Sequence, residues 1–148
     1  MFEKEKEALN LELSKKLKEL GFPQDGGGWY WGIKNYQREL LFCNHSQVTL
    51  WIKYHQEELG YREIIKVPTC RELLEIKERG IIIDIWYDSS TRRFNVKCLV
   101  EKEDFDNPPY KEEFGKRLSD LLAKIRIWLA ENGYVKFKRK GGELNEVR

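Results

Sequence analysis

The sequence predicts an α+β fold: one domain with a mainly antiparallel, twisted sheet of about six or seven strands packed against a long C-terminal helix, with two shorter helices. The first supporting observation is helical periodicity near the C-terminus. The second is a series of short aromatic and β-branched runs separated by polar or glycine turns. The third is the length of 148 residues, which suits one domain with a real core. We expect residues 1–8 and 141–148 to be frayed ends of this single domain, 1–148.

The long helix is predicted over residues 107–133. Asn107 can cap it, Pro108 and Pro109 can begin a helix but not continue one, and Gly133 supplies a left-handed stop. The helix would be the largest surface on which the strands can pack, and its charge-balanced outer face argues against a functional site there. Its apolar face has i, i+3, i+4, i+7 spacing and consists of Phe114, Leu118, Leu121, Leu122, Ile125, Trp128 and Leu129.

A first short helix is expected from about Leu9 to Gly21, with leucines at positions 9, 13, 17 and 20 on one face. Asn10 can cap it. The glycines at 26, 27 and 28 then form a flexible connection. A phosphate loop needs a following helix N-terminus, whereas the next residues are typical of a strand, so phosphate binding is not expected here.

The predicted strands cover residues 29–33, 39–43, 48–54, 61–67, 81–87, 93–100 and 134–138. In the third of these, Leu50, Ile52 and Tyr54 alternate with Thr49, Trp51 and Lys53, which suggests one core face and one face with an exposed aromatic. Residues 81–100 form the strongest hairpin signal, and the short spacing of the strands favours antiparallel pairing.

A second short helix is predicted after Pro68, because Thr69 and Glu72 fit the reciprocal capping box. Leu73, Leu74 and Ile76 continue it up to Gly80. Cys70 falls at its first position, where the helix dipole could lower a thiol pKa. We nevertheless interpret Cys70 as a thiol that happens to begin a helix, because no histidine partner is identifiable.

Composition argues against several function classes. Charged residues make up 35% of the chain but the net charge is only +2, whereas a dedicated double-stranded DNA binder usually has a strong basic excess. The three cysteines have no regular spacing, so reduced thiols in a cytosol are expected. The charged N-terminus has no apolar signal-peptide core, and no apolar run approaches the length of a membrane span.

The sequence contains few candidates for metal ligands or catalytic groups. Cys43 and His45 share one side of a strand and could ligate zinc together with His55, but they are one weak pair, so neither a metal nor a cofactor is predicted. Asp84 interrupts an apolar strand and shares a face with Trp86. We expect that face to be solvent-exposed on an edge strand; if it were buried, Asp84 would need a partner. No nucleophile elbow, Walker loop or dinucleotide fingerprint is present, so catalysis is not favoured.

Binding is the more natural use of this composition. Aromatic residues in the predicted strands are interleaved with Lys and Arg, a combination that stacks on bases and contacts phosphates. The alternative interpretation is that most of these aromatics fill the core and only a few are exposed. The basic segment with Lys136, Lys138, Arg139 and Lys140 reads as a solvated end. The candidate ligand-binding residues are Trp29, Trp31, Lys34, Arg38, Trp51, Lys53, Trp86, Arg92 and Arg93.

Three stretches of the chain are similar to segments of a known protein family: LSKKLKELGFPQ at 13–24, VPTCRELLE at 67–75 and IWLAENGYV at 127–135. In this order the chain resembles a family of small uncharacterised phage and prophage proteins over roughly residues 9–137. It departs from that family in its charged N-terminal arm, its triple glycine and its basic tail. The family has no established active site, so no catalytic residue is carried over.

The resemblance implies an accessory protein of a virus or mobile element, located in the cytoplasm of a bacterial host. The leading hypothesis is a non-catalytic protein that sequesters a nucleotide-like signal or inhibits a host defence protein. One alternative is a nucleic-acid-binding accessory factor that uses the aromatic strands and the basic tail. The other is a small enzyme with an unrecognised site. A homo-oligomer is compatible with each, because an exposed aromatic sheet face suits a dimer as well as a ligand.

Overall fold

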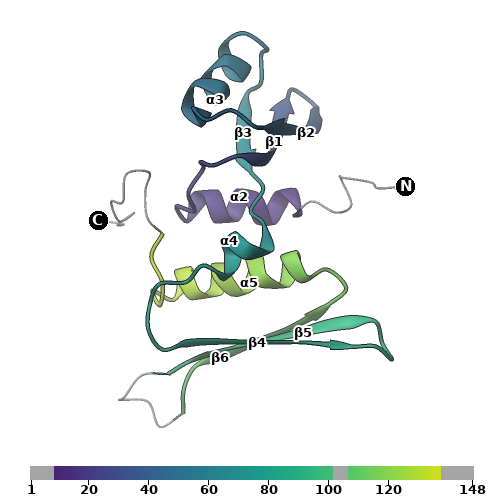
Figure 1. The fold of residues 1–148 in the computed structure, drawn as a ribbon, viewed down its shortest axis with the longest axis vertical. Helices are drawn as coiled ribbons and strands as arrows, with labels where there is room; N and C mark the ends of the chain where they lie inside the picture. The colour runs from purple at the N-terminus through teal and green to yellow at the C-terminus, as the bar shows by residue number, and fades with distance from the viewer. Residues whose placement is uncertain (1–8, 102–106, 138–148) are drawn as a thin grey trace. The chain divides into compact units, whose positions relative to one another are not determined.

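A computed structural model describes residues 9–101 and 107–137, so the predicted frayed ends lie outside the described residues. The α+β class is confirmed (Figure 1). The single sheet of six or seven strands is wrong, because the described strands form two three-stranded antiparallel sheets. These sheets belong to two compact units, residues 9–68 and residues 69–101 with 107–137. Their organisation as one domain stays a prediction.

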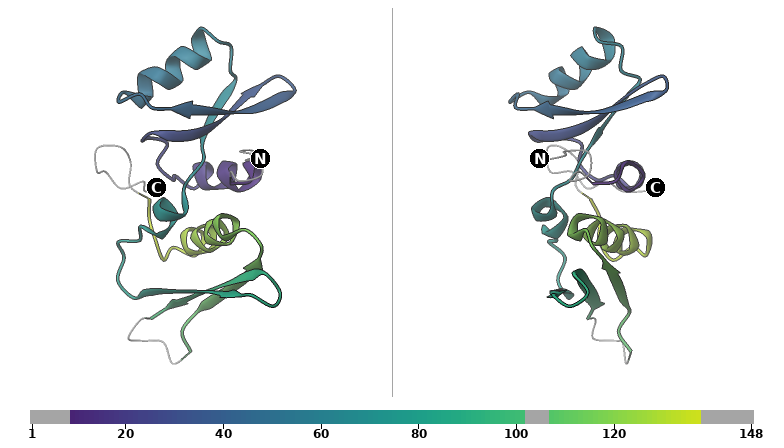
Figure 2. Two further views of the ribbon diagram at one scale, coloured as in Figure 1. Left: turned by 45° about the vertical axis from the view of Figure 1, so that its right-hand side comes forward. Right: turned by 90° about the vertical axis from the view of Figure 1, so that its right-hand side faces the viewer.

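The first unit is a three-stranded sheet with one helix on each side (Figures 1 and 2). The strand order is β2-β1-β3, with β1 in the centre. Trp31 on one side of β1 donates its indole N–H to the carbonyl of Leu9, while Tyr30 on the other side packs on Trp51 of α3. The elements are α2 (Leu11–Glu19), β1 (Gly28–Lys34), β2 (Gln37–Cys43), α3 (Val48–Glu57) and β3 (Glu63–Lys66).

The first predicted helix is confirmed as α2. Asn10 caps it by accepting a hydrogen bond from the Glu12 amide at 2.7 Å. It ends before Gly21, whose φ of 97° requires the left-handed conformation that glycine tolerates. The expected leucine face is only partly correct, because the buried residues of the helix are Leu11, Ser14 and Leu17.

The predicted strand at residues 48–54 is wrong, because this segment is helix α3. Its β-branched and aromatic residues also fit a helical period: Val48, Trp51, Ile52 and His55 follow i, i+3, i+4, i+7 spacing and are its less exposed positions. Val48, Trp51 and Ile52 belong to the apolar cluster on this side of the sheet. Packing on the sheet has therefore overridden local strand propensity.

The second unit contains the sheet β4-β5-β6, with α5 along one face (Figures 1 and 2). The predicted hairpin is confirmed, with β4 and β5 paired over their whole length. Buried Val96, Cys98 and Val100 of β5 form the core under α5 together with Leu121, Leu122 and Ile125. The elements are α4 (Cys70–Leu74), β4 (Ile81–Asp88), β5 (Arg93–Val100), β6 (Tyr110–Gly115) and α5 (Leu118–Glu131).

The prediction of one long helix over 107–133 is wrong in its first half. Residues Tyr110–Gly115 form β6, and the helix begins only at Leu118. The apparent helical position of Phe114 arose by chance, since its side chain is 61% exposed on the sheet. The strand predicted at 134–138 is also absent over the described residues 134–137, where Val135 and Phe137 are nevertheless buried.

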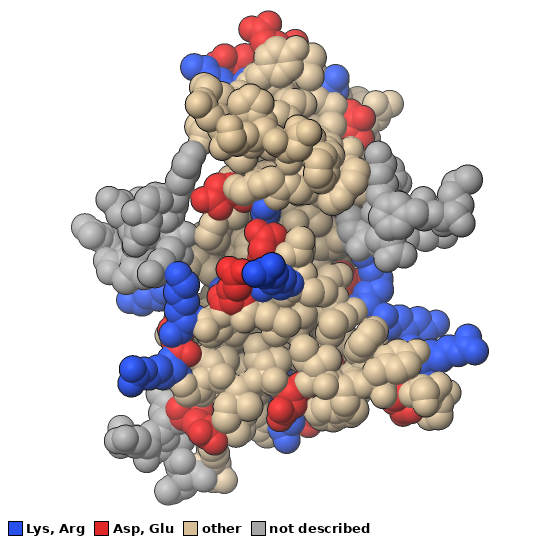
Figure 3. All heavy atoms as spheres, in the orientation of Figure 1, with Lys and Arg blue, Asp and Glu red and all other residues tan. Residues whose placement is uncertain are grey.

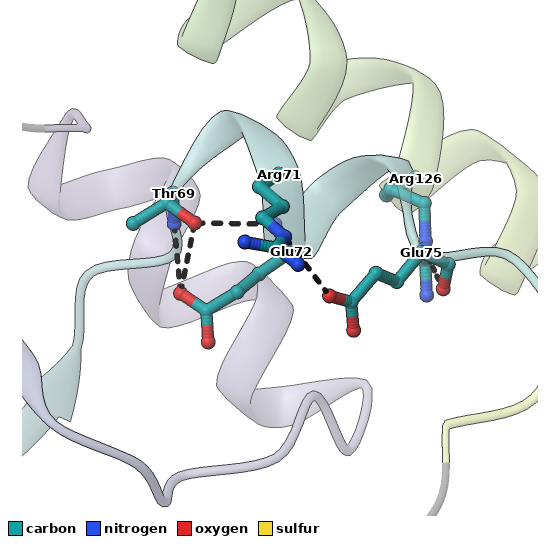
Figure 4. A network of polar contacts seen from close by, with 5 residues as sticks. All are labelled: Thr69, Arg71, Glu72, Glu75 and Arg126. Atoms are coloured by element: carbon teal, nitrogen blue, oxygen red, sulfur yellow. Dashed lines mark hydrogen bonds and ion pairs between the residues drawn. The ribbon is translucent and has the colours of Figure 1, made fainter.

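Helix α4 is held at both ends (Figure 4). The predicted capping box is confirmed, with Thr69 and Glu72 exchanging side-chain-to-backbone hydrogen bonds. The helix ends at Leu74 rather than near Gly80, because Arg126 of α5 donates to the carbonyls of Leu73 and Glu75 at 3.0 and 3.1 Å. A buried arginine of α5 thus satisfies two backbone carbonyls at the C-terminal end of α4.

Candidate binding face

The side of the β4-β5-β6 sheet opposite α5 is the candidate site. The side facing α5 is identified by two contacts: Glu113 pairs with Lys124 at 4.0 Å, and a Cβ on Gly115 would lie 3.0 Å from Leu121. Cross-strand partners in an antiparallel sheet share a face, so the opposite side is fixed by the register. We define the open face as Ile82, Asp84, Trp86, Asn95, Lys97, Leu99, Tyr110, Glu112 and Phe114.

The open face is rich in exposed apolar groups. Trp86 and Phe114 are 46% and 61% exposed and flank Asn95 in one row. Ile82 and Tyr110, 38% and 59% exposed, flank Leu99 in a parallel row. No described helix of this unit covers this side, since α5 packs against β5 and β6 from the other face and α4 packs on α5. Exposed apolar side chains gathered on one sheet face in this way mark an interaction surface.

A charged row separates the two apolar rows. Lys97 lies between Asp84 and Glu112 on the neighbouring strands, and its ammonium group is 5.2 Å from the centroid of the Tyr110 ring. Two carboxylates around one ammonium make this row net acidic. On the face of the molecule drawn in Figure 3, acidic and basic side chains are interspersed.

The structure separates the predicted ligand-binding residues between the two units. Only Trp86 lies on the open face. Arg92 and Arg93 are exposed at the adjoining hairpin, where Arg92 has a φ of 57°. The prediction that Asp84 shares an exposed face of an edge strand with Trp86 is confirmed.

The other six predicted residues belong to the first unit and do not form one cluster. Trp31 is a core residue, 4% exposed, and Arg38 lies 5.6 Å from its ring. Trp29 contacts Phe42 on this same side of the sheet, and Lys34 and Trp51 lie on the opposite side. Lys53 is exposed on α3. Ligand binding by the exposed members stays a prediction.

A polar cluster on the α3 side of the first sheet is the other notable group. Tyr61 donates a short hydrogen bond to the Glu39 carboxylate, and Lys34 lies 4.5 Å from the centroid of its ring. Burial raises the pKa of Tyr61 to about 12, and the hydrogen bond and charge of Glu39 act in the same direction. The phenol therefore stays protonated at ordinary pH and is a structural donor rather than a base.

The candidate thiols and imidazoles are accounted for by burial, stacking and hydrogen bonding. The lowered pKa suggested for Cys70 is wrong, because burial raises the pKa of this thiol. Cys43 is buried, and His55 stacks on Trp51 at 4.1 Å while its Nδ1 hydrogen-bonds the Trp51 carbonyl. Within residues 9–101 and 107–137, no three His, Cys, Asp or Glu side chains are grouped as metal ligands.

Sequence reasoning missed Lys97, Tyr110 and Phe114 as surface groups of the open face. A signal was present after Pro109. Tyr110, Glu112 and Phe114 alternate with Lys111, Glu113 and Gly115, which is the two-residue period of a strand with an exposed aromatic side. The two prolines and the downstream helical pattern obscured it.

Comparison with known proteins adds no assignment. No protein family, curated protein or solved structure matches this chain. None of the described helices combines the length and apolar character that a membrane-spanning helix requires.

Proposed function

We propose that this protein acts by binding, without catalysis, and that the open face is the surface that contacts a protein partner. The observation that carries the proposal is the set of four exposed apolar side chains, three of them aromatic, on an uncovered sheet face. Aromatic side chains dominate the energetics of protein interfaces because they bury a large area at a low cost in conformational entropy. The resemblance to phage and prophage proteins suggests a host defence component as the partner.

The charged row favours a protein over a nucleic acid. A phosphate backbone crossing this face would meet Asp84 and Glu112 beside Lys97, and these carboxylates would repel it. A protein partner can match the row with opposite charges, which supplies register and specificity.

The test is recovery of a partner from bacterial lysate with tagged protein, followed by binding measurements on the purified pair. Trp86→Ala and Phe114→Ala should each weaken the complex about 30-fold, the effect of losing a hot-spot residue of roughly 2 kcal/mol. Tyr36→Ala is the matched control, because Tyr36 is fully exposed in the turn before β2 and is not part of the open face. Equal affinities for all three variants would refute the proposal.

A nucleotide is the second candidate, favoured by one feature. Trp86 and Phe114 flank the Asn95 amide, with Arg92 and Arg93 at the adjoining hairpin, so an aromatic ring, a base-reading amide and cations occur on one hairpin. Calorimetry against cyclic and ADP-ribose-type nucleotides tests it. Heat that disappears with Trp86→Ala would support nucleotide sequestration, whereas no heat with any nucleotide would exclude those tested.

A further inference from the structure

The two outer strands of the second sheet differ sharply in how their free edges are protected. Strands β4 and β6 each pair with β5 alone among the described strands, so each leaves one row of backbone N–H and C=O groups unpaired. Strand β6 follows Pro108 and Pro109 and carries three charged residues in six, YKEEFG. Strand β4 has the sequence IIIDIWYD, with six apolar residues in eight. Charges and prolines are the usual protection against edge pairing, and β4 largely lacks them.

The apolar character of β4 continues onto the side of the sheet that carries α5. Ile83, Ile85 and Tyr87 point to that side, as partners of Cys98, Val96 and Phe94. Helix α5 packs against β5 and β6 and leaves this outer strip accessible, so that Ile85 is 38% and Tyr87 52% exposed. An unpaired backbone edge therefore borders exposed apolar side chains.

We propose that β4 pairs in antiparallel fashion with β4 of a second copy of this chain, about a two-fold axis at Ile85. The result is a continuous six-stranded sheet, β6-β5-β4-β4-β5-β6. A second strand is the group that can satisfy a strand edge along its whole length, and an antiparallel pair of identical strands closes with two-fold symmetry. This inference goes beyond the proposed function because it concerns the backbone edge of β4, although the pairing would bring the open faces of the two copies side by side at Ile82, Asp84 and Trp86.

The register follows from the side chains of β4. In the pairing centred on Ile85, Ile85 faces Ile85 of the second copy, and Ile83 faces Tyr87, so the two exposed strips merge on the α5 side. On the other side Trp86 faces Asp84 and Ile82 faces Asp88, and no two like charges are directly opposite. The pairing centred on Asp84 would oppose two Asp84 carboxylates, and the pairing centred on Trp86 would oppose Asp84 and Asp88. The pairing centred on Ile83 opposes no like charges but joins only the part of the strand from Ile81 to Ile85.

Charge balance within each copy is compatible with this register. Asp84 and Asp88 each have a cation as their cross-strand partner on β5, namely Lys97 and Arg93. The acidic groups of β4 are thus screened within their own sheet. Among the registers that keep each side chain on its own face, the one centred on Ile85 pairs the longest part of β4 without opposing like charges, which is why we assign a second copy as the occupant of the edge.

The first test is sedimentation equilibrium of the full chain. The wild type should be a dimer, and Ile85→Lys and Ile85→Glu should each be monomeric, because each places like charges opposite one another at the two-fold axis. Mixing these two variants should restore a 1:1 heterodimer through the opposed Lys and Glu. Leu50→Lys is the control, since Leu50 is similarly exposed but lies on α3, and it should remain dimeric.

The second test reads the register directly and does not depend on the charged variants folding. In a Cys70→Ser background, Ile85→Cys should form an intermolecular disulfide, because directly opposed residues have Cα atoms about 4.5–5.5 Å apart. Ile83→Cys alone should not, but a mixture of Ile83→Cys and Tyr87→Cys proteins should. A wild type that is monomeric at its highest attainable concentration would overturn the proposal. So would a dimer that Ile85→Lys leaves intact, or cross-linking of Ile83→Cys with itself.

Discussion

Replacing Arg126 should destabilise the second unit more than any other single change to a charged residue there. The side chain is 5% exposed, and its guanidinium donates to the Leu73 and Glu75 carbonyls at the end of α4. It also lies 5.0 Å from the centroid of the Phe137 ring. Burial lowers the pKa of Arg126, and the negative charges of Glu78 and Glu75 oppose that shift.

The magnitude for Arg126→Ala follows from these contacts. Hydrogen bonds from a charged donor are worth about 1.5–3 kcal/mol each, and the contact with an aromatic ring about 0.5–2 kcal/mol. Removal of the arginine also relieves the cost of burying its charge, so the contributions do not add fully. We expect the free energy of unfolding to fall by about 3–5 kcal/mol, the range for loss of a buried polar network.

Urea unfolding followed by far-UV circular dichroism measures this change. Arg126→Lys should recover part of the loss, because an ammonium group keeps the charge but the shorter lysine side chain does not place it where Nη1 of Arg126 donates to both carbonyls. Lys124→Ala is the control on the same helix; its exposed ion pair with Glu113 at 4.0 Å is worth about 0–1 kcal/mol. A loss below about 1 kcal/mol for Arg126→Ala would refute the view that this arginine fastens α4 to α5.

Three further changes test the local structure. Gly32→Ala should cost about 1–3 kcal/mol in urea unfolding, because a Cβ there would lie 2.6 Å from Leu41 and 2.9 Å from the Tyr61 ring; a neutral result would show that these side chains can move aside. Thr69→Ala should cost about 1 kcal/mol through loss of the capping box, and Thr69→Ser should restore most of it. Finally, the folded-state pKa of Tyr61 is raised, so the stabilising effect of its protonated phenol is complete below pH 10 and is lost as the pH rises toward about 12. Tyr61→Phe should remove that component from the stability profile and the matching step from the absorbance titration at 295 nm, and an unchanged titration would contradict the assignment.

The elements that were predicted correctly from the sequence begin or end at a local signal, such as a helix cap, a glycine or a tight turn. Asn10 and Gly21 bound α2, Thr69 and Glu72 begin α4, and the residues between Asp88 and Arg93 turn the hairpin. Each of these signals depends on neighbours within a few residues. Local chemistry therefore sufficed to place them.

The errors occur where the same residues satisfy two periods. Residues 48–54 alternate as a strand would, yet Val48, Trp51 and Ile52 also share a helix face, and only the sheet beneath them decides. Residues 110–115 continue the helical period of α5, yet they pair with β5. In both segments the deciding contact is distant in sequence, so a local pattern could not reveal it.

From the sequence, the candidate site could be predicted only as an exposed strand face with an aromatic residue, and its complete set of residues could not. Trp86 and the exposed position of Asp84 followed from alternation along one strand. The partners that complete the open face, Phe114 and Tyr110, come from β6, whose strand character was missed. Predicting a sheet surface requires the identity and register of each strand, and the misassignment of β6 left two of the three aromatic side chains of the open face unpredicted.

The buried amine of Lys66 can be used to measure how often the first unit opens locally. Its side chain is 1% exposed and its ammonium group donates to the carbonyls of Gly26 and Gly27, at 3.4 and 3.0 Å, beside the ring of Tyr30. Acylating reagents react with lysines on the surface within minutes but can reach this amine only when the glycine loop separates from β3. The labelling rate of Lys66, followed by mass spectrometry, therefore measures the local opening of the sheet without any engineered probe.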